Sequence, residues 1–361
     1  MQKTQNRSAH STAALTVPLR SHEDLSALIV LLIFVALATI VWAQPEAEAA
    51  RLKPAFRESR QIERTVSVER HDTVAIQHQF GNVQVNCWPE AKVRVSGELV
   101  AGGDSKACAE SCLNLMTVRI EPQGRRLDIS AVPDKAECSA TQYQSDLAVT
   151  VPEDAVLTID NSYGDLTVVD LQGMVTTSNR FGNSDVHRCW SADITNAFGD
   201  VNVDQFAHGI TVRNRFGNVS ARNLAGPIQI SNENGTVRVI RGTGRAQLAN
   251  TLGEMSLVGL QGRIQITNVH GPVIFRQLKP GPDTVTINNR DGEIHLKLPE
   301  DASALVNVRT SDGRVENQHP GARKRSSDER SGQSVSYELG SKLAQFNLET
   351  TGGKVVLGAE P

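Results

Sequence analysis

Residues 192–201 read ADITNAFGDV, residues 210–219 read ITVRNRFGNV and residues 228–237 read IQISNENGTV. Each stretch has an asparagine three residues before a glycine, and apolar residues alternate with polar ones on both sides of that glycine. A period of two is typical of strands that bury one face, and glycine is the residue that tight turns accept most readily. Each stretch therefore predicts two short strands joined by a tight turn.

The same pattern runs along most of the chain at a spacing close to 18 residues. Its turn glycines are Gly164, Gly182, Gly199, Gly217, Gly235, Gly253 and Gly271, with looser copies at Gly292, Gly313 and Gly353. A second column, Gly173, Gly226, Gly244 and Gly262, marks the other corner. One strand pair cannot bury its own apolar face, but stacked pairs can. The sequence therefore predicts an all-β fold, a parallel β-solenoid of about 18-residue coils.

The asparagine column has the same parity as the inward apolar residues. Its members are Asn161, Asn179, Asn196, Asn214, Asn232, Asn250 and Asn268. Because side chains alternate across a strand, these amides are expected to point into the coil and to hydrogen-bond along the stack. We interpret the column as an internal asparagine ladder in preference to a polar binding strip.

An aromatic column stands directly before the glycines, at Tyr163, Phe181, Phe198 and Phe216, with Phe80 in an earlier copy. Aromatic rings on consecutive coils can stabilise the stack by packing on each other. Exposed rings would instead offer a strip for contact with a glycan. The sequence favours packing and keeps glycan contact as the alternative.

The N-terminal part predicts export. Residues 27–44 hold an uncharged apolar run, expected to be a transmembrane anchor or a signal segment, and residues 1–26 would stay in the cytoplasm under the positive-inside rule. A retained single-pass anchor is favoured. The alternative is cleavage near Ala43, which would leave a secreted or periplasmic protein.

The exported part divides into a linker (45–60), a β cap subdomain with cysteines (61–150) and the solenoid (151–357), with a charged loop at 318–333. Four cysteines, Cys87, Cys108, Cys112 and Cys138, are candidates for disulfides in an oxidising compartment, whereas Cys189 is expected to be unpaired. A metal site on Cys108 and Cys112 is disfavoured because no second ligand pair follows at zinc spacing.

Composition and motifs exclude several functions. The chain has 361 residues, 4% aromatic residues and a net charge of −3, which lacks the basic surplus that nucleic-acid binding needs. Asp165 and Asp200 share a column, but Asn183 lies between them, so the carboxylates would stand about 10 Å apart. Asp and Asn have a structural reason to occupy turns. We predict no catalytic residue, no cofactor and no metal.

The stretches LAVTVP (147–152) and LTIDNSYGDLTV (157–168), followed by repeated Gly-x-Val-x-Val strands, resemble the bacterial putative adhesin domain of unknown function. The resemblance covers roughly residues 75–357. It implies a parallel β-helix-like repeat domain, often behind a single transmembrane segment. It defines no catalytic or ligand residues.

Together these features predict a non-enzymatic, membrane-attached and exported rod that acts as an adhesin or as an interaction or scaffold protein of the cell envelope. The expected partners are the membrane, through the N-terminal segment, and an envelope polysaccharide or envelope protein. The sequence sets no oligomeric state. The alternatives are an envelope-stress sensor that works through a protein partner and, less favoured, a polysaccharide-active enzyme.

Overall fold

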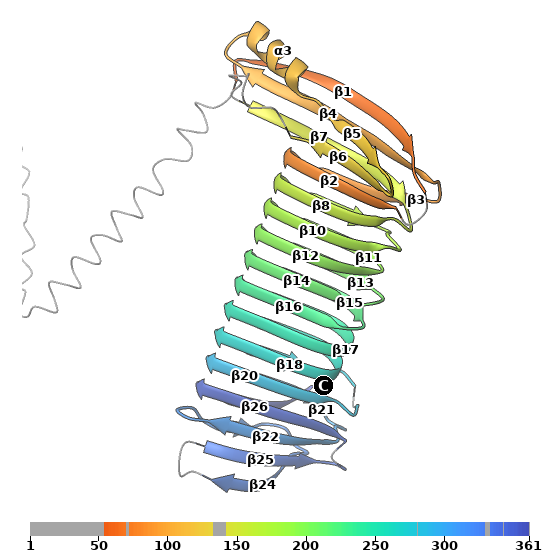
Figure 1. The fold of residues 1–361 in the computed structure, drawn as a ribbon. Helices are drawn as coiled ribbons and strands as arrows, with labels where there is room; N and C mark the ends of the chain where they lie inside the picture. The colour runs from red at the N-terminus through yellow and green to blue at the C-terminus, as the bar shows by residue number, and fades with distance from the viewer. Residues whose placement is uncertain are drawn as a thin grey trace, which may run out of the picture. The chain divides into compact units, whose positions relative to one another are not determined.

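Strand–glycine–strand coils stack along one axis in the computed structural model of the protein (Figure 1). The structure describes residues 54–69, 72–132, 142–279, 281–328, 333–341 and 343–360. The predicted membrane or signal segment, 27–44, lies outside these residues. Within them, no helix has the length and apolar character needed to cross a membrane. Residues 54–361 form one compact unit that contains the whole apolar core.

The strands form one hydrogen-bonded sheet that folds into two facing layers. In spatial order, layer A holds β5 (Arg119–Gln123), β6 (Arg126–Ala131), β2 (Thr73–Phe80), β8 (Val156–Tyr163), β10 (Met174–Phe181), β12 (Ser191–Phe198), β14 (Ile210–Phe216), β16 (Ile228–Asn234), the second parts of β17 (Val237–Leu252) and β18 (Met255–His270), β20 (Thr284–Asp291), β26 (Ala344–Gly352), β22 (Ala304–Thr310), β25 (Gln333–Leu339) and β24 (Arg323–Asp328).

Layer B holds the partner strand of each coil. In spatial order these strands are β1 (Phe56–Ser67), β4 (Lys92–Gly103), β7 (Gln142–Pro152), β3 (Val83–Trp88), β9 (Leu166–Val169), β11 (Ser184–Cys189), β13 (Val201–Phe206), β15 (Val219–Ala225), the first parts of β17 and β18, β19 (Val273–Arg276), β21 (Ile294–Pro299), β27 (Val355–Glu360) and β23 (Val315–Asn317). Strands β17 and β18 run through a corner without a break, which joins the two layers.

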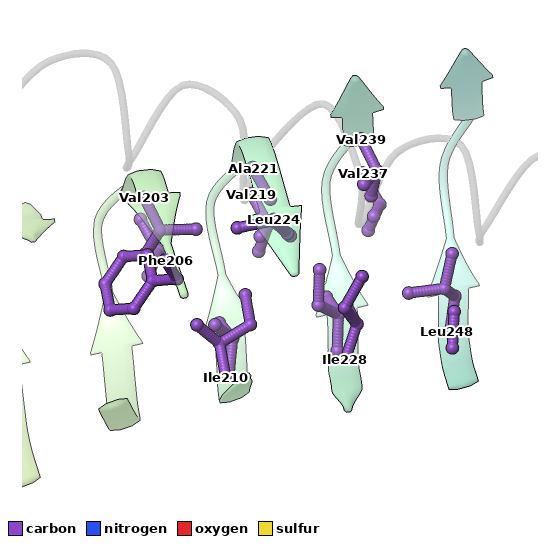
Figure 2. Close-up of a cluster of buried hydrophobic side chains, with 14 of the residues drawn as sticks. Val203, Phe206, Ile210, Val219, Ala221, Leu224, Ile228, Val237, Val239 and Leu248 are labelled. Carbon is purple, nitrogen blue, oxygen red and sulfur yellow. The ribbon is translucent and has the colours of Figure 1, made fainter. Parts of the chain in front are cut away.

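Successive coils pair in parallel and without slippage, so equivalent residues lie side by side. Asn196 lies beside Asn214, and Asn214 lies beside Asn232. Because a slip of one residue would turn every apolar side chain toward solvent, this register also builds the core. Figure 2 shows Ile210 and Ile228 from layer A gathered with Val219 and Val237 from layer B in the interior, and all four are buried.

The first coil is not the first strand pair in space. Strands β2 and β3 are followed by an excursion, residues 92–152, whose strands β6 and β7 pair with the outer edges of β2 and β3. The solenoid register therefore begins at Thr73, and the division into a cap (61–150) and a solenoid (151–357) stays a prediction. The repeat does not reveal this pairing because Gly81 and Gly164 are 83 positions apart, which interrupts the spacing of about 18 residues.

The cap also contains a helix, α3 (Lys106–Leu115), where only strands were expected. The side chain of Ser105 accepts a hydrogen bond from the Cys108 backbone N–H and so caps the helix N-terminus. Cys112 is buried against β4 and forms a disulfide, while Cys138 lies outside the described residues. Cys87 is a free thiol in β3, so its predicted role as a disulfide candidate is corrected, and Cys189 is also free.

The C-terminal end repeats the out-of-order arrangement. Strands β26 and β27, the last in sequence, lie between the β20–β21 coil and the β22–β23 strands. The segment 318–333, predicted as a charged loop, contributes β24, which pairs in antiparallel fashion with β25. Strand β25 covers the edge of β22, and β24 in turn covers the edge of β25, which explains why a polar, charged sequence takes a strand conformation here.

Each coil turns at a glycine that almost touches the previous coil. Gly217 has φ +132°, and a Cβ atom built on it would lie 2.1 Å from the carbonyl oxygen of Gly199. The corner requires glycine both for its backbone conformation and for the close approach between coils.

We expect Gly217→Ala to lower the free energy of unfolding by more than about 3 kcal/mol, because strained backbone and a backbone clash add together. Gly124→Ala is the matched control: Gly124 also has positive φ, at +62°, but a Cβ atom there would meet nothing within 4 Å. The control should cost about 1 kcal/mol. Equal losses in urea titrations of the two variants would show that contact between coils does not restrict the corner.

Candidate functional site

The corner formed by the turn glycines brings together both columns that the sequence singled out. All seven predicted asparagines are buried there, between 1% and 4% exposed. The Nδ2 atom of Asn161 donates to Oδ1 of Asn179 at 3.1 Å, and Asn196 donates to Asn214 in the same way at 3.1 Å. Their amides also donate to corner carbonyls, as from Asn196 to Gly199 O at 2.9 Å. The column is closed to solvent and therefore offers no ligand a binding strip.

The buried column is longer than the sequence indicated, and it ends in different residues. Toward the cap, His78 stands beside Asn161 in register, and its Nδ1 atom lies 2.7 Å from Asn161 Oδ1. Its Nε2 atom lies 2.9 Å from Ser145 Oγ. At the other end, Asn289 is followed by Thr350 and then Thr310. The signal that would have found them is their position three residues before Gly81, Gly353 and Gly313.

The aromatic column is exposed and stacked at the same time. Tyr163, Phe181, Phe198 and Phe216 are 37–43% exposed. Their successive ring centroids are 4.9–5.0 Å apart with interplanar angles of 6–10°, and Phe80 extends the stack at 5.3 Å. Ring faces at this spacing cover each other, so solvent meets mainly ring edges. A sugar that stacks on an aromatic ring needs an open face.

The column ends at Phe216, whose ring has the Arg215 guanidinium 5.3 Å from its centroid. In the next coil the equivalent residue is Asn234. The terminal ring thus also has a neighbour over its face. The geometry is that of packing between coils, which the sequence favoured, and it weakens the alternative of a glycan strip.

A second polar ladder runs along the outside of this corner, immediately after the glycines. The backbone N–H of Asn183 donates to Asp165 Oδ1 at 2.8 Å, that of Asp200 to Asn183 Oδ1 at 2.9 Å, and that of Asn218 to Asp200 Oδ1 at 2.7 Å. Asp165 and Asp200 are therefore acceptors in a chain of turn hydrogen bonds, two coils apart. In the described part of the chain, no group of three or more His, Cys, Asp or Glu residues has the arrangement to hold a metal.

The opposite corner has a backbone feature that the sequence did not reveal. Five consecutive coils place a residue other than glycine in the left-handed region, six positions after the turn glycine; they are Asp170, Arg188, Gln205, Asn223 and Arg241, with φ between 53° and 65°. Across two coils of this column, Arg188 forms an ion pair with Asp170 at 2.5 Å, and this pairing lowers the pKa of Asp170. A left-handed turn without glycine gives no composition signal, which is why it was missed.

The two free thiols lie in the wall of the solenoid near this corner. Burial raises the pKa of Cys87 to about 12 and that of Cys189 to about 11. Since the thiolate is the reactive form, both thiols are inert in the folded protein.

A family model fits this architecture over nearly all of the described residues. It is the model of Toastrack DUF4097, and it matches residues 46–357. The chain belongs to the Toastrack family. This confirms the family resemblance predicted from the 147–168 motif and the glycine repeat. A comparison of this Toastrack chain with curated proteins finds no match.

Three solved structures align with most of the Toastrack chain. One is described as a putative cell adhesion protein from Clostridium sporogenes (TM-score 0.22, 10% identity, covering 84% of this chain and 100% of that chain). The second is a putative lipid binding protein from Parabacteroides distasonis (0.37, 13%, 84% and 97%), and the third is a putative adhesin from Bacteroides fragilis (0.32, 12%, 82% and 97%). Similarity this low supports no functional argument for the Toastrack chain.

We expect His78 to make stability depend on pH. Burial lowers the pKa of His78 below its usual 6.5, so the fold prefers the neutral ring. Stability from this group is fully present above about pH 6.5 and is lost as the pH falls below it. His78→Asn places the ladder's own residue there and removes the titration. The urea midpoint should therefore fall less between pH 7 and pH 5 in the variant than in the native chain; equal falls would show that His78 is not responsible.

We expect Phe198→Ala to destabilise the solenoid by about 1–3 kcal/mol, because it removes two stacked pairs worth about 0.5–1.5 kcal/mol each. Leu252→Ala is the matched control, since Leu252 occupies the same column and is 45% exposed, but its neighbours in register are Asn234 and His270, not Phe or Tyr. Thermal unfolding followed by circular dichroism measures both. A loss no larger in Phe198→Ala than in the control would contradict the packing role.

Proposed function

We propose that the protein is a non-enzymatic binding or scaffold rod of the bacterial cell envelope, held at the membrane by residues 27–44, whose outer faces contact envelope polymer or protein. One observation carries this proposal. The Asp and Asn side chains of the turn corner, the best candidates for chemistry, are bound in the inner and outer ladders. What the coils leave available to a partner is therefore two long outer faces.

These faces are suited to extended contacts. Layer A presents Ser178, Thr195, Ser231 and Thr267 outward in one column, all exposed. Layer B presents Asn202 and Ser220 in a neighbouring pair, in register. The small polar side chains in these columns offer many hydrogen-bonding groups, which suits a partner that runs along the rod.

The test measures retention of residues 54–361, which contain the complete core, on isolated cell envelopes. We expect saturable retention. Two double variants assign the face. The first, Thr195→Glu with Ser231→Glu, adds charge to layer A, and the second, Asn202→Glu with Ser220→Glu, adds the same charge to layer B. Loss of retention in only one double variant identifies the layer that contacts the envelope. Protease treatment of the envelopes separates a protein partner from a polymer. The absence of retention on any envelope fraction would overturn the proposal.

A further inference from the structure

The outer face of layer B changes its chemistry halfway along the rod. The residues five positions after the turn glycines lie side by side in register, in the order Asp204, Arg222, Ile240, Val258, Arg276 and Lys297. Two neighbouring apolar side chains are thus bracketed by basic ones along the axis. In the earlier coils the same column holds Val169 and His187, without a basic residue.

The apolar centre is wider than this pair. Ile274 lies one coil on, opposite Ser256 and diagonal to Val258. All three side chains point outward and are half-buried, because Val239, Leu257 and Phe275 take the inward positions. Outward apolar residues on three successive strands form a continuous surface, whereas scattered single ones would need no explanation.

Leu278 extends this surface around the corner. In the previous coil the equivalent position is Leu260, which is buried. The coil from Gly271 to Gly292 is longer, and here Gln277 is buried and donates to buried Asp283, so Leu278 turns outward and is 43% exposed. The longer coil thus places Leu278 at the surface, whereas its equivalent Leu260 lies in the core.

A shallow hollow of about 290 Å³ lies beside Leu278. It is lined by Leu224, Gly242, Gly259, Leu278, Arg241 and Lys279, among others. Gly259 keeps it open because it carries no side chain; a Cβ atom on Gly259 would already meet Leu278 at 3.0 Å. No acidic residue lines it. An apolar floor with two cations at the rim fits part of an anionic amphiphile.

Several cations around this surface have no partner. Arg222, Arg238, Arg241 and Lys279 form no ion pair with any residue in the described ranges, although Arg222 is next to Asp204 in register. On this face Glu360 pairs with Arg276. Asp204 accepts a hydrogen bond from Asn223, and buried Asp283 accepts from Gln277 and from the Gly262 N–H.

Charged residues are also unevenly distributed along the chain, with the basic ones concentrated in the coils that carry this surface. Residues 142–204 hold two basic and ten acidic side chains, whereas residues 205–299 hold eleven basic and five acidic ones. The overall charge of −3 conceals this division, and the basic surplus of the second half can attract an anionic surface.

We propose that Ile240, Val258, Ile274 and Leu278, with the surrounding Arg222, Arg238, Arg241 and Lys279, form a basic–apolar face that docks on the surface of an anionic lipid bilayer. The apolar centre enters the boundary between headgroups and acyl chains, and the cations contact lipid phosphates. An anionic polysaccharide would match the cations but leave the apolar centre in water, which is why a lipid surface is favoured. This proposal rests on the envelope location proposed above.

The test uses residues 54–361, so that the predicted anchor cannot contribute, with vesicles of phosphatidylcholine alone or mixed with phosphatidylglycerol. We expect co-sedimentation with the anionic vesicles that weakens as salt screens the charges. Val258→Asn should weaken it severalfold, whereas Val169→Asn, the same change in the same column of the earlier coils, should not. Circular dichroism verifies that both variants fold.

Charge reversal supplies the second comparison. Arg238→Glu should weaken binding by about fivefold or more, since each basic residue near an anionic surface contributes about that factor. Arg180→Glu alters net charge equally, from an exposed position on layer A, and should have little effect. Equal losses of vesicle binding in the two variants would show that binding depends only on net charge and would overturn the assigned face.

Three further outcomes would overturn the proposal. The first is the absence of vesicle binding; if envelope retention persists, the lipid docking fails while the proposed function stands. The second is equal binding to soluble dextran sulfate with no effect of Val258→Asn, which would identify a polyanion site. The third is a dimer in sedimentation velocity that Val258→Asn dissociates, which would assign the face to a second copy of the chain.

Discussion

The close approach of each corner glycine to the carbonyl of the preceding corner glycine sets the register of the whole solenoid. At Gly182, Gly199 and Gly217 a Cβ atom would lie 2.1 Å from that oxygen, so the coils cannot shift past each other there. Every column follows from this constraint. The inner asparagines, the outer Asp and Asn ladder and the stacked rings line up because the glycines fix the height of each coil.

The same constraint explains how a rod with so few aromatic residues is held together. Aliphatic side chains fill the narrow interior between the layers, and the corner satisfies its own polar groups through Asn161, Asn196 and their equivalents. Buried amides are costly without partners, and hydrogen bonds between neighbouring coils, such as those from Asn161 to Asn179 and from Asn196 to Asn214, offset part of this cost. The outer faces, which are proposed to contact a partner, take no part in this interior packing.

Sequence patterns predicted the repeating part well because its determinants are local. The parity of Asn196 relative to Ile194 indicates an inward side chain, and the structure buries both. The ends were not predictable in this way, since the pairing of β2 with β6 and of β26 with β22 joins segments that no period relates. Likewise, nothing in composition distinguishes exposed Leu278 from buried Leu260; only the longer coil does, through the burial of Gln277 and Asp283. For the aromatic column, the repeat predicted the positions of the rings, but whether ring edges or ring faces meet solvent depends on the ring planes, which the sequence does not show.

The placement of the C-terminal strands has a consequence for biogenesis. Because β26 and β27 occupy a slot between β20–β21 and β22–β23, strands that are synthesised after β22 and β23 are needed in the interior of the stack. A chain that stops before residue 344 is thus not a shorter rod. It has two unpaired strand edges facing each other across a vacant layer, and such edges recruit foreign strands. Synthesis of residues 344–360 is therefore the step that closes the stack, because the facing edges of the strands on either side stay unpaired until β26 and β27 lie between them.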